Sequence, residues 1–242
     1  MSLDRQVNDW SLTADEVVSL FREAGARLEG HFVFSSWRHA GKYLKREILT
    51  MPDSERQYER LCQALAANIA AMIESGVEID FLTGPANGGV VLARAVQPLL
   101  YELGHKLELI PTIKLGDKLF GLDYDLKYLL KRRGVMVEDV VTTGDSCTGA
   151  MNPFALSGAT IVSVHCFLNL LGRTEADLNV EHFKPLIDEE LETFDVKNLG
   201  WRSCPMCVRR EDINTDEGVG RGAEFVAKYG QPSTWSDSDT LL

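Results

Sequence analysis

Two spacings of apolar residues follow one another along most of the chain. Apolar positions three or four residues apart predict amphipathic helices, and short β-branched runs between them predict strands. Capping patterns at Thr13-Ala-Asp-Glu16 and at Ser54-Glu-Arg-Gln57 mark two of the helix starts. The pattern predicts helices over 13–25, from 54 through 73, over 90–103 and up to about 157, and strands over 31–39, 79–83, 107–113, 135–139 and 159–168. Because strands and helices alternate, we expect an α/β fold with a parallel sheet and right-handed crossovers.

Composition narrows the classes of protein that the chain can belong to. A length of 242 residues with 45% apolar residues suits one large α/β domain or two small ones. The longest apolar stretches, such as 90–100, are too short and interrupted to span a bilayer, and the polar N-terminus does not look like a secretory signal. Five cysteines without a regular framework suit a reducing cytoplasm. A net charge of −11 argues against a nucleic-acid surface.

The most informative segment is the apolar run that ends in Glu138 and Asp139 and leads into a hydroxyl-rich turn. A strand that stops at such a turn before a helix leaves backbone N–H groups pointing one way, which makes an anion site. The two acids repel phosphate and suit hydroxyl groups or a bound metal. A phosphate at one end and a sugar at the other describe a phosphorylated ribose. The turn consists of Thr142, Thr143, Gly144, Asp145 and Ser146.

A second glycine-rich loop follows the predicted strand over 79–83. Its three glycines and one proline let backbone approach a ligand closely, and ligands of open α/β sheets collect at the carboxyl ends of strands. Taken alone, the loop could equally be a tight turn with no ligand. Together with the Glu138 segment it favours a site for the two ends of one large anion. Its residues are Gly84, Pro85, Ala86, Asn87, Gly88 and Gly89.

These motifs resemble those of the type I phosphoribosyltransferases, and most strongly those of orotate phosphoribosyltransferases. The resemblance runs from about residue 12 to residue 174. It rests on the segment 30–39, on the loop 84–89, and on 137–144, which matches the family's motif for phosphoribosyl diphosphate (PRPP). It implies a single domain over 1–242, with a hood from 1–50. It also implies transfer of 5-phosphoribose from PRPP to orotate in pyrimidine biosynthesis, with Mg²⁺, and a homodimer. The change in composition after about residue 195, with a CxxC, scattered acids and several Gly and Pro, predicts a peripheral C-terminal extension.

The resemblance assigns roles to further residues. Arg173 falls where the family holds the orotate carboxylate, and Tyr43 and Leu44 are assigned to the base. Lys114 and Lys118 lie in the segment that corresponds to the family's mobile catalytic loop, here 114–130. The loop 84–89 is expected to contact pyrophosphate, and Asp139 is expected to act in catalysis with the two lysines.

The chain departs from the family's pattern around the base and the loop. It has Trp37 in place of a glycine, Ala40 in place of a serine, Ile113 in place of an arginine, and Asn169-Leu170 in place of Asp-Arg. Two alternatives therefore stay open: a phosphoribosyltransferase for another base, and a non-catalytic PRPP-binding regulator. A regulator acting on DNA should carry a basic helix-turn-helix segment, and the chain has none. A base panel with PRPP would distinguish a transferase from a regulator.

The pair Cys204 and Cys207 is half of a zinc ribbon. Structural zinc needs four ligands and a second CxxC is absent, so one chain alone is not expected to bind it. A two-fold dimer could instead join two such pairs into one four-thiolate site. The histidines at 31, 39, 105 and 165 lack the spacing of ligands. We expect His165, in a predicted buried strand, to be a hydrogen-bonded core residue.

Overall fold

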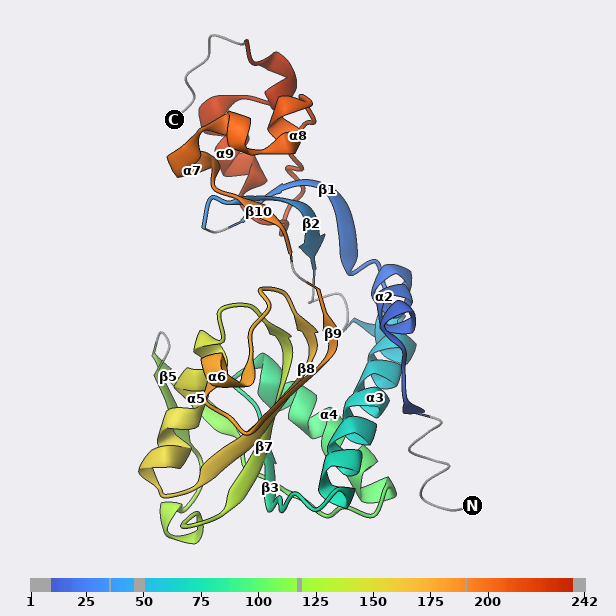
Figure 1. Ribbon diagram of the computed structural model, residues 1–242, viewed down its shortest axis with the longest axis vertical. Coiled ribbons are helices and arrows are strands. Elements are labelled where there is room, and N and C mark those ends of the chain that lie inside the picture. The colour runs from blue at the N-terminus through green and yellow to red at the C-terminus, as the bar shows by residue number, and fades with distance from the viewer. Residues whose placement is uncertain (1–9, 35, 46–50, 117–118, 190, 237–242) are drawn as a thin grey trace. The chain divides into compact units, whose positions relative to one another are not determined.

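The computed structural model describes residues 10–34, 36–45, 51–116, 119–189 and 191–236, and it divides into two compact units (Figure 1). Unit 1 consists of Met1–Leu20 and Glu55–Glu190, and unit 2 of Phe21–Ser54 and Leu191–Leu242. The segments expected to form the hood and the C-terminal extension therefore fall largely into one unit. The expectation of a single domain stays a prediction.

Unit 1 is built on a parallel sheet. Within the described residues the strand order is β4-β3-β7-β8-β9, with β3 and β8 on either side of β7. The expected α/β fold with a parallel sheet is confirmed. The strands are β3 (Phe81–Thr83), β4 (Glu108–Leu109), β7 (Arg133–Val141), β8 (Thr160–Asn169) and β9 (His182–Asp188).

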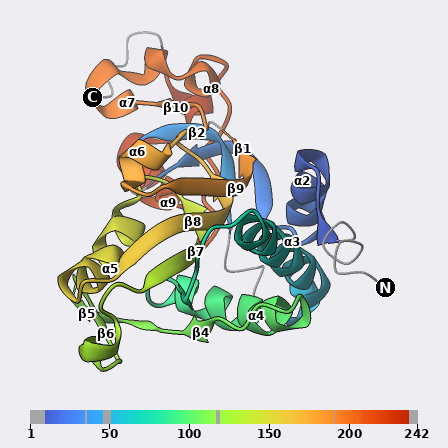
Figure 2. The same cartoon turned by 60° about the horizontal axis from the view of Figure 1, so that its bottom comes forward.

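Helices cover both faces of this sheet (Figure 2). Helices α3 (Glu55–Glu74) and α4 (Gly88–Glu102) lie on one face, and α5 (Asp145–Leu156) lies on the other. Phe154 of α5 stacks on Phe81 of β3 with ring centroids 5.1 Å apart, and both belong to a core cluster that includes Met136 and Val164. The sheet is therefore buried on both sides, which explains the continuous apolar runs of β7 and β8.

The capping patterns predicted two helix starts correctly. Helix α2 (Ala14–Glu23) begins after Thr13, whose backbone N–H donates to Glu16 Oε2 at 2.8 Å while its hydroxyl accepts from the Glu16 N–H at 3.3 Å. Helix α3 begins one residue after Ser54. Its predicted apolar stripe is buried at Leu61, Leu65 and Ile69.

The segment expected to be one strand over 107–113 is divided instead. Two residues form β4 in the parallel sheet, and the chain then enters an antiparallel hairpin of β5 (Thr112–Gly116) and β6 (Leu119–Leu122). A 3-10 turn, η3 (Leu126–Tyr128), follows. The segment 114–130, which the sequence left without elements, thus carries part of a hairpin whose tip lies outside the described residues.

Unit 2 joins an antiparallel ribbon to the C-terminal segment. Strands β1 (Arg27–Val33) and β2 (His39–Leu44) pair, and β10 (Thr193–Phe194) adds to β2. Val33 of the ribbon shares a core with Trp201, Phe225 and Trp235. The C-terminal helices and turns are α7 (Val196–Leu199), η4 (Trp201–Ser203), α8 (Pro205–Val208), α9 (Gly222–Tyr229) and η5 (Pro232–Thr234), and unit 2 also holds η2 (Pro52–Ser54). Unit 1 also contains the short helix α6 (Glu175–Leu178).

The predicted strand over 31–39 is wrong in its middle, because the chain turns there. The backbone N–H of Phe34 donates to the Arg38 carbonyl at 2.9 Å, and that of Trp37 donates to the Phe34 carbonyl at 2.9 Å. Trp37 takes a left-handed conformation with a φ of 62°. This is the position where the resembling family has glycine, the residue that adopts such a conformation without a steric penalty. Gly41, expected at the turn, lies inside β2.

Within the described residues, no helix is long and apolar enough to cross a membrane. Inside the sheet, His165 of β8 is fully buried as expected, but neither ring nitrogen has a hydrogen-bond partner in the described part of the chain. The expectation of a hydrogen-bonded histidine is therefore wrong. Burial lowers the pKa of His165 to about 3, and repulsion from Lys184 and His182 adds to the shift.

This depressed pKa predicts a loss of stability in acid. The ordinary value is 6.5, so below that pH the unfolded chain binds a proton that the folded chain excludes. Stability present above pH 6.5 is lost as the pH falls toward 3, by up to about 1.4 kcal/mol per pH unit. Urea unfolding at about pH 7 and about pH 5 measures the decrease in unfolding free energy in acid. This decrease should be smaller for His165→Leu than for the wild type.

His182→Asn is the matched control, because His182 is only half-buried on the neighbouring strand. Its unfolding free energy should decrease between about pH 7 and about pH 5 by nearly as much as that of the wild type. An unchanged pH dependence in His165→Leu would contradict the assignment of that loss to His165.

Candidate functional site

Strand β7 delivers two carboxylates to the carboxyl edge of the sheet. Glu138 is buried, with 7% of its surface exposed, and Asp139 is half-buried. The Asp139 N–H donates to Glu138 Oε1 at 3.1 Å, and the Val140 N–H donates to Asp139 Oδ1 at 2.7 Å. The two acids are inside β7 rather than after it, so the ladder to β8 fixes the backbone that carries them.

The turn after β7 leads directly into the N-terminus of α5, as the sequence predicted. Gly144 is the N-cap with a φ of 83°, and the Thr148 hydroxyl donates to its carbonyl at 3.1 Å. Thr142, Thr143 and Ser146 are exposed around it. The N–H groups of a helix's first turn have no partner within the helix, and the helix dipole adds positive potential there. The turn is therefore built to accept an anion.

The loop 84–89 closes tightly on itself and on β7. A Cβ on Gly84 would lie 2.2 Å from the Gly89 carbonyl oxygen, and one on Gly89 would lie 2.8 Å from the Val137 carbonyl oxygen. The Thr112 hydroxyl donates to the Gly84 carbonyl at 2.7 Å and fixes the start of the loop. Only glycine can occupy 84 and 89, because any side chain there would overlap backbone. The Ala86–Asn87 peptide bond is cis.

The two motifs meet at one place. A Cβ on Gly88, at the start of α4, would lie 3.9 Å from Asp139 Oδ2, so the second glycine loop borders the acid pair. Loop 84–89, the acids of β7 and the turn before α5 form one surface, which we call the acid-pair site. The backbone N–H groups at the starts of α4 and α5 can bind anions on either side of the two carboxylates.

Cys147 and the partly buried Tyr58 lie close enough to the acid pair to be affected by its charge. Burial raises the pKa of the Cys147 thiol, and the negative charges of Glu138 and Asp139 raise it further. Burial also raises the pKa of Tyr58 on α3, with smaller contributions from Cys62 and Asp139. Both groups are therefore neutral at physiological pH, and neither compensates the charge of the two acids. Tyr58 could not be recognised from the sequence, because it occupies an ordinary position in a helix.

Arg173 lies at the same edge of the sheet, after β8. Its Nε donates to the Thr142 carbonyl at 3.2 Å, and its Nη1 lies 3.8 Å from Asp177 Oδ1. Asn169 holds the intervening turn, because its side chain bonds to the backbone N–H and carbonyl of Arg173. A hollow of about 450 Å³ lies beside Arg173, and it is lined by Asn169, Gly172, Arg173, Thr174, Glu175, Phe183, Pro185 and Asp188.

The remaining predicted site residues lie on other elements or outside the described residues. Lys114 is exposed on β5, and Lys118 lies outside the described residues. Tyr43 and Leu44 are on β2 in unit 2, so their assignment to the base stays a prediction. Cys204 and Cys207 are also in unit 2, at the start of α8, where they meet His31 and His39. The sequence set these two histidines aside because their spacing is not that of ligands.

Comparison with known proteins identifies the family. The chain is 35% identical over 161 residues to orotate phosphoribosyltransferase 2 of Mesorhizobium japonicum, which covers 65% of this chain and 77% of that protein. It is 31% identical over 202 residues to the orotate phosphoribosyltransferase of Carboxydothermus hydrogenoformans, covering 80% and 92% respectively. The chain belongs to the orotate phosphoribosyltransferase family. No protein-family model matches it.

Solved structures agree with this family at the level of the fold. The orotate phosphoribosyltransferase of Francisella tularensis has a TM-score of 0.56 at 18% identity, covering 88% of this chain and 98% of that chain. The orotate phosphoribosyltransferase of Aeropyrum pernix has a TM-score of 0.51 at 21% identity, covering 71% and 93%. The fold is thus the type I phosphoribosyltransferase fold that the sequence predicted.

The closed geometry of the glycine loop predicts different effects at two neighbouring positions. In Gly89→Ala the new Cβ would lie 2.5 Å from Pro85 Cδ and 2.8 Å from the Val137 carbonyl oxygen. We expect this variant to lose about 1–3 kcal/mol of unfolding free energy. Gly88→Ala is the matched control, because its nearest neighbour is Asp139 Oδ2 at 3.9 Å. Urea denaturation measures both, and equal stability of the two variants would contradict the packing described here.

Proposed function

We propose that the protein transfers 5-phosphoribose from PRPP to orotate, giving orotidine 5′-monophosphate and pyrophosphate, as a step of pyrimidine nucleotide biosynthesis. The observation that carries the proposal is the contact between the two motifs of unit 1. Gly88 borders Asp139, and Asp139 is six residues before the N-terminus of α5. Backbone amides at the start of α4, the carboxylates of β7 and backbone amides at the start of α5 follow one another in this site. A ligand with a phosphate group at each end and hydroxyl groups between them matches that order.

In this proposal each part of the acid-pair site binds one part of PRPP. The turn of Thr142 to Ser146 binds the 5′-phosphate through the first N–H groups of α5. Glu138 and Asp139 accept hydrogen bonds from the ribose hydroxyls. The loop 84–89 binds the diphosphate through its backbone, because its glycines allow the ligand to approach main-chain N–H groups.

The chemistry requires stabilisation of a cation and exclusion of water. Forming the C1′–N bond passes through a ribose with oxocarbenium character, which water would otherwise trap. Orotate is already an anion, so no strong general base is needed, and rate enhancement comes from positioning and charge. The carboxylates of Glu138 and Asp139 favour the positive charge that develops on the ribose. Lys114, on β5, and Lys118, which lies outside the described residues, are proposed to close over the departing diphosphate.

Mg²⁺ is the metal that suits the oxygen donors of PRPP. Mg²⁺ prefers hard oxygen ligands and few of them from protein, so diphosphate and ribose oxygens of PRPP would hold it and no protein side chain is proposed as a direct ligand. When bound, the ion neutralises part of the diphosphate charge. Glu138 and Asp139 are then the protein groups that orient the ribose hydroxyls.

Arg173 is proposed to pair with the orotate carboxylate. A guanidinium holds a carboxylate through two parallel hydrogen bonds, which uracil and purines cannot accept in the same way. To do so, Arg173 has to leave Asp177. Because their side chains are 32% and 41% exposed and 3.8 Å apart, this costs no more than about 1 kcal/mol. The contact with the Thr142 carbonyl keeps the arginine beside the PRPP turn.

The proposal extends to assembly and location. We propose a homodimer, for which exposed apolar side chains in the segment 113–130 offer a surface. We also propose a cytoplasmic location, since the five cysteines are all free and buried. No nucleic acid or membrane partner is expected. The exposed apolar residues are Ile113, Leu115, Leu119, Leu126, Tyr128 and Leu130.

A base panel tests the proposed reaction. Purified protein is incubated with PRPP, Mg²⁺ and one of orotate, uracil, adenine or hypoxanthine, and pyrophosphate release is measured. Release with orotate alone supports the proposal. The Asn169-Leu170 departure favours a second candidate, a transferase for another base, and release with uracil or a purine would establish it. PRPP binding without release for any base would instead indicate a regulator.

Removing one charge of the acid pair should almost abolish turnover while preserving the fold. Asp139→Asn keeps the shape of the side chain but no longer compensates the ribose cation, so we expect kcat to fall by roughly a hundredfold or more. Calorimetric titration with PRPP and Mg²⁺ should show weaker binding, and urea unfolding should show nearly unchanged stability. Asp15→Asn, at an exposed acid of α2, is the control and should bind PRPP as the wild type does. Wild-type PRPP affinity in Asp139→Asn would refute the assigned role.

Base discrimination should depend on Arg173. Arg173→Ala should lower kcat/KM for orotate by roughly several tens- to several thousandfold, the loss of a charge-assisted pair of about 2–5 kcal/mol. Its kcat/KM for uracil should change little. Arg173→Lys keeps the charge but cannot form the two parallel hydrogen bonds. Its kcat/KM for orotate should lie between those of the wild type and Arg173→Ala. If Arg173→Ala prefers orotate over uracil by the wild-type ratio, another residue selects the base.

A further inference from the structure

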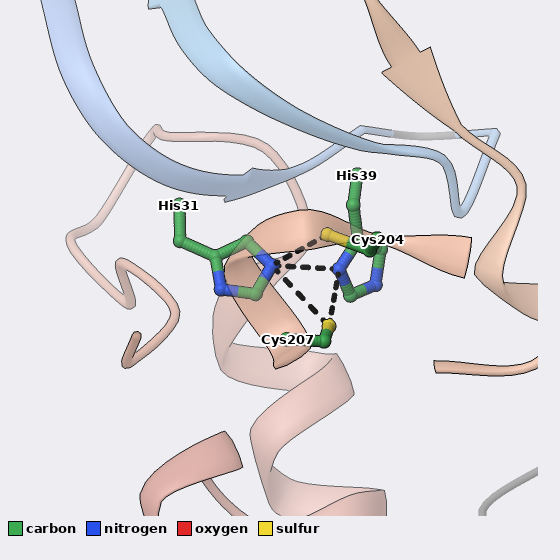
Figure 3. Close-up of side chains that lie close together, drawn as sticks. All are labelled: His31, His39, Cys204 and Cys207. Atoms are coloured by element: carbon green, nitrogen blue, oxygen red, sulfur yellow. Dashed lines mark hydrogen bonds between the residues drawn. The ribbon is translucent and has the colours of Figure 1, made fainter. Parts of the chain in front are cut away.

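Unit 2 contains a cluster of four side chains of the kinds that bind transition metals, outside the acid-pair site. His31 and His39 come from the ribbon of β1 and β2, and Cys204 and Cys207 come from the start of α8 (Figure 3). All four residues are buried, and one potential ligand atom from each lies within 4.8 Å of the others. Figure 3 shows the four side chains pointing toward one another.

A β-bulge puts both histidines on the same face of the ribbon. Between Glu29 and Phe32 the register of β1 against β2 shifts by one residue. After the shift Val33 pairs with His39, and His31 is two residues from Val33, so all three side chains share a face. Without the shift, His39 would lie opposite Phe32, and His31 would point to the other side. The bulge therefore determines that two imidazoles converge here.

The distances agree with a tetrahedral centre of two nitrogens and two sulfurs. His31 Nε2 lies 3.8 Å from Cys204 Sγ and 3.7 Å from Cys207 Sγ, and His39 Nδ1 lies 3.4 Å from Cys207 Sγ. Zinc bonds of about 2.0 Å to nitrogen and about 2.3 Å to sulfur put such atoms about 3.6 Å apart in a tetrahedron. The two ring nitrogens are 2.7 Å apart and would separate by about 0.6 Å on binding.

Hydrogen bonding prepares His31 for coordination. Its Nδ1 lies 2.7 Å from the Glu211 carbonyl oxygen, which can only accept, so Nδ1 carries the proton. Nε2 then has a lone pair that faces the cluster. Donation of the outer ring N–H to a backbone carbonyl is the usual support of a metal-bound histidine. The neighbouring chain is also fixed, because the Asn214 N–H donates to the His31 carbonyl at 2.8 Å.

Without a metal the cluster leaves polar groups poorly satisfied. His39 Nε2 is buried beside the ring of Phe225, and it has no hydrogen-bond partner among the described residues. Thiols are weak donors and weak acceptors, so two of them compensate the buried imidazoles poorly. A metal bound through Nδ1 would leave His39 a single outer N–H and would bring four strong bonds to the buried side chains.

We propose that His31, His39, Cys204 and Cys207 bind one structural Zn²⁺ within a single chain. Two imidazoles and two thiolates complete the coordination shell, so no position remains open for a substrate, and the site is structural rather than catalytic. It links the ribbon to α8 across 173 residues of sequence between His31 and Cys204. The CxxC pair therefore needs no second pair from another chain.

Metal analysis of the full chain tests this site independently of PRPP turnover. Protein prepared without chelator, then reduced, demetallated and reloaded with Zn²⁺, should hold about one zinc per chain after gel filtration. X-ray absorption at the zinc edge should show two sulfur ligands at about 2.3 Å and two nitrogen ligands at about 2.0 Å. Since this spectrum uses the wild type, it stands even if a variant fails to fold.

Variants locate the metal. Cys204→Ser, Cys207→Ser and His31→Asn should each lose most of the zinc, whereas Cys62→Ser, at a buried free cysteine of α3 in unit 1, should retain it. Chelation should change the tryptophan fluorescence of the wild type and lower its thermal midpoint, because Trp37, Trp201 and Trp235 lie in unit 2. The same chelator should leave zinc-free Cys204→Ser unchanged.

Several results would overturn the proposal. A wild-type chain that binds no zinc after reduction and reloading would leave only a cluster of thiols and imidazoles. Zinc at about half an equivalent with four sulfur ligands would indicate a site shared by two chains. Zinc retained at the wild-type level in the Cys204→Ser, Cys207→Ser double variant would place the metal elsewhere.

Discussion

The parallel pairing of β7 between β3 and β8 is the constraint on which the acid-pair site depends. Parallel strands end at the same edge of a sheet, so the loop after β3 and the turn after β7 emerge side by side. The contact is close enough that residues 84 and 89 have no room for a side chain. Burial of the sheet between α3, α4 and α5 holds this edge rigid. Binding groups carried on backbone amides need that rigidity, because they cannot adjust by rotating a side chain.

Local sequence chemistry predicted much of unit 1. Thr13 and Ser54 mark helix starts because capping is an interaction between residues a few positions apart. The Glu138 segment and the loop 84–89 were recognisable for a similar reason, since glycines, hydroxyls and acids at fixed offsets define a turn wherever it lies in the fold. The hairpin of β5 and β6 was missed, because its pairing depends on residues across the turn rather than on a periodic pattern. Roles that need a ligand, such as those of Lys114 and Arg173, stay predictions.

Unit 2 was less predictable because its structure depends on contacts between distant segments. Trp37 illustrates this. A left-handed conformation costs a non-glycine residue about 1–2 kcal/mol, and the family's glycine would avoid that cost. In this chain the indole packs 6.1 Å from the Phe225 ring, and the Arg221 guanidinium lies 5.8 Å from its centre. Both partners belong to the C-terminal segment, so aromatic packing offsets the backbone penalty. The packing of unit 2 therefore accounts for Trp37 in this conformation, and its effect on the base site stays a prediction.

The convergence of His31 and His39 on Cys204 and Cys207 also depends on contacts between distant segments of the chain. Gly30 lies in the bulge of β1 with a φ of 151°, a conformation open to glycine, and the bulge turns His31 to the face of His39. Neither histidine is recognisable as a ligand from spacing, because the residues that complete the cluster are more than 160 positions away. The core shared by Val33, Trp201 and Phe225 brings the two segments together, and the cluster lies within it. A small unit with few strands has a limited core, and a metal is a common way to stabilise one. Two independent interactions thus stabilise the contact between the ribbon and the C-terminal segment: the apolar core and the proposed set of four ligands.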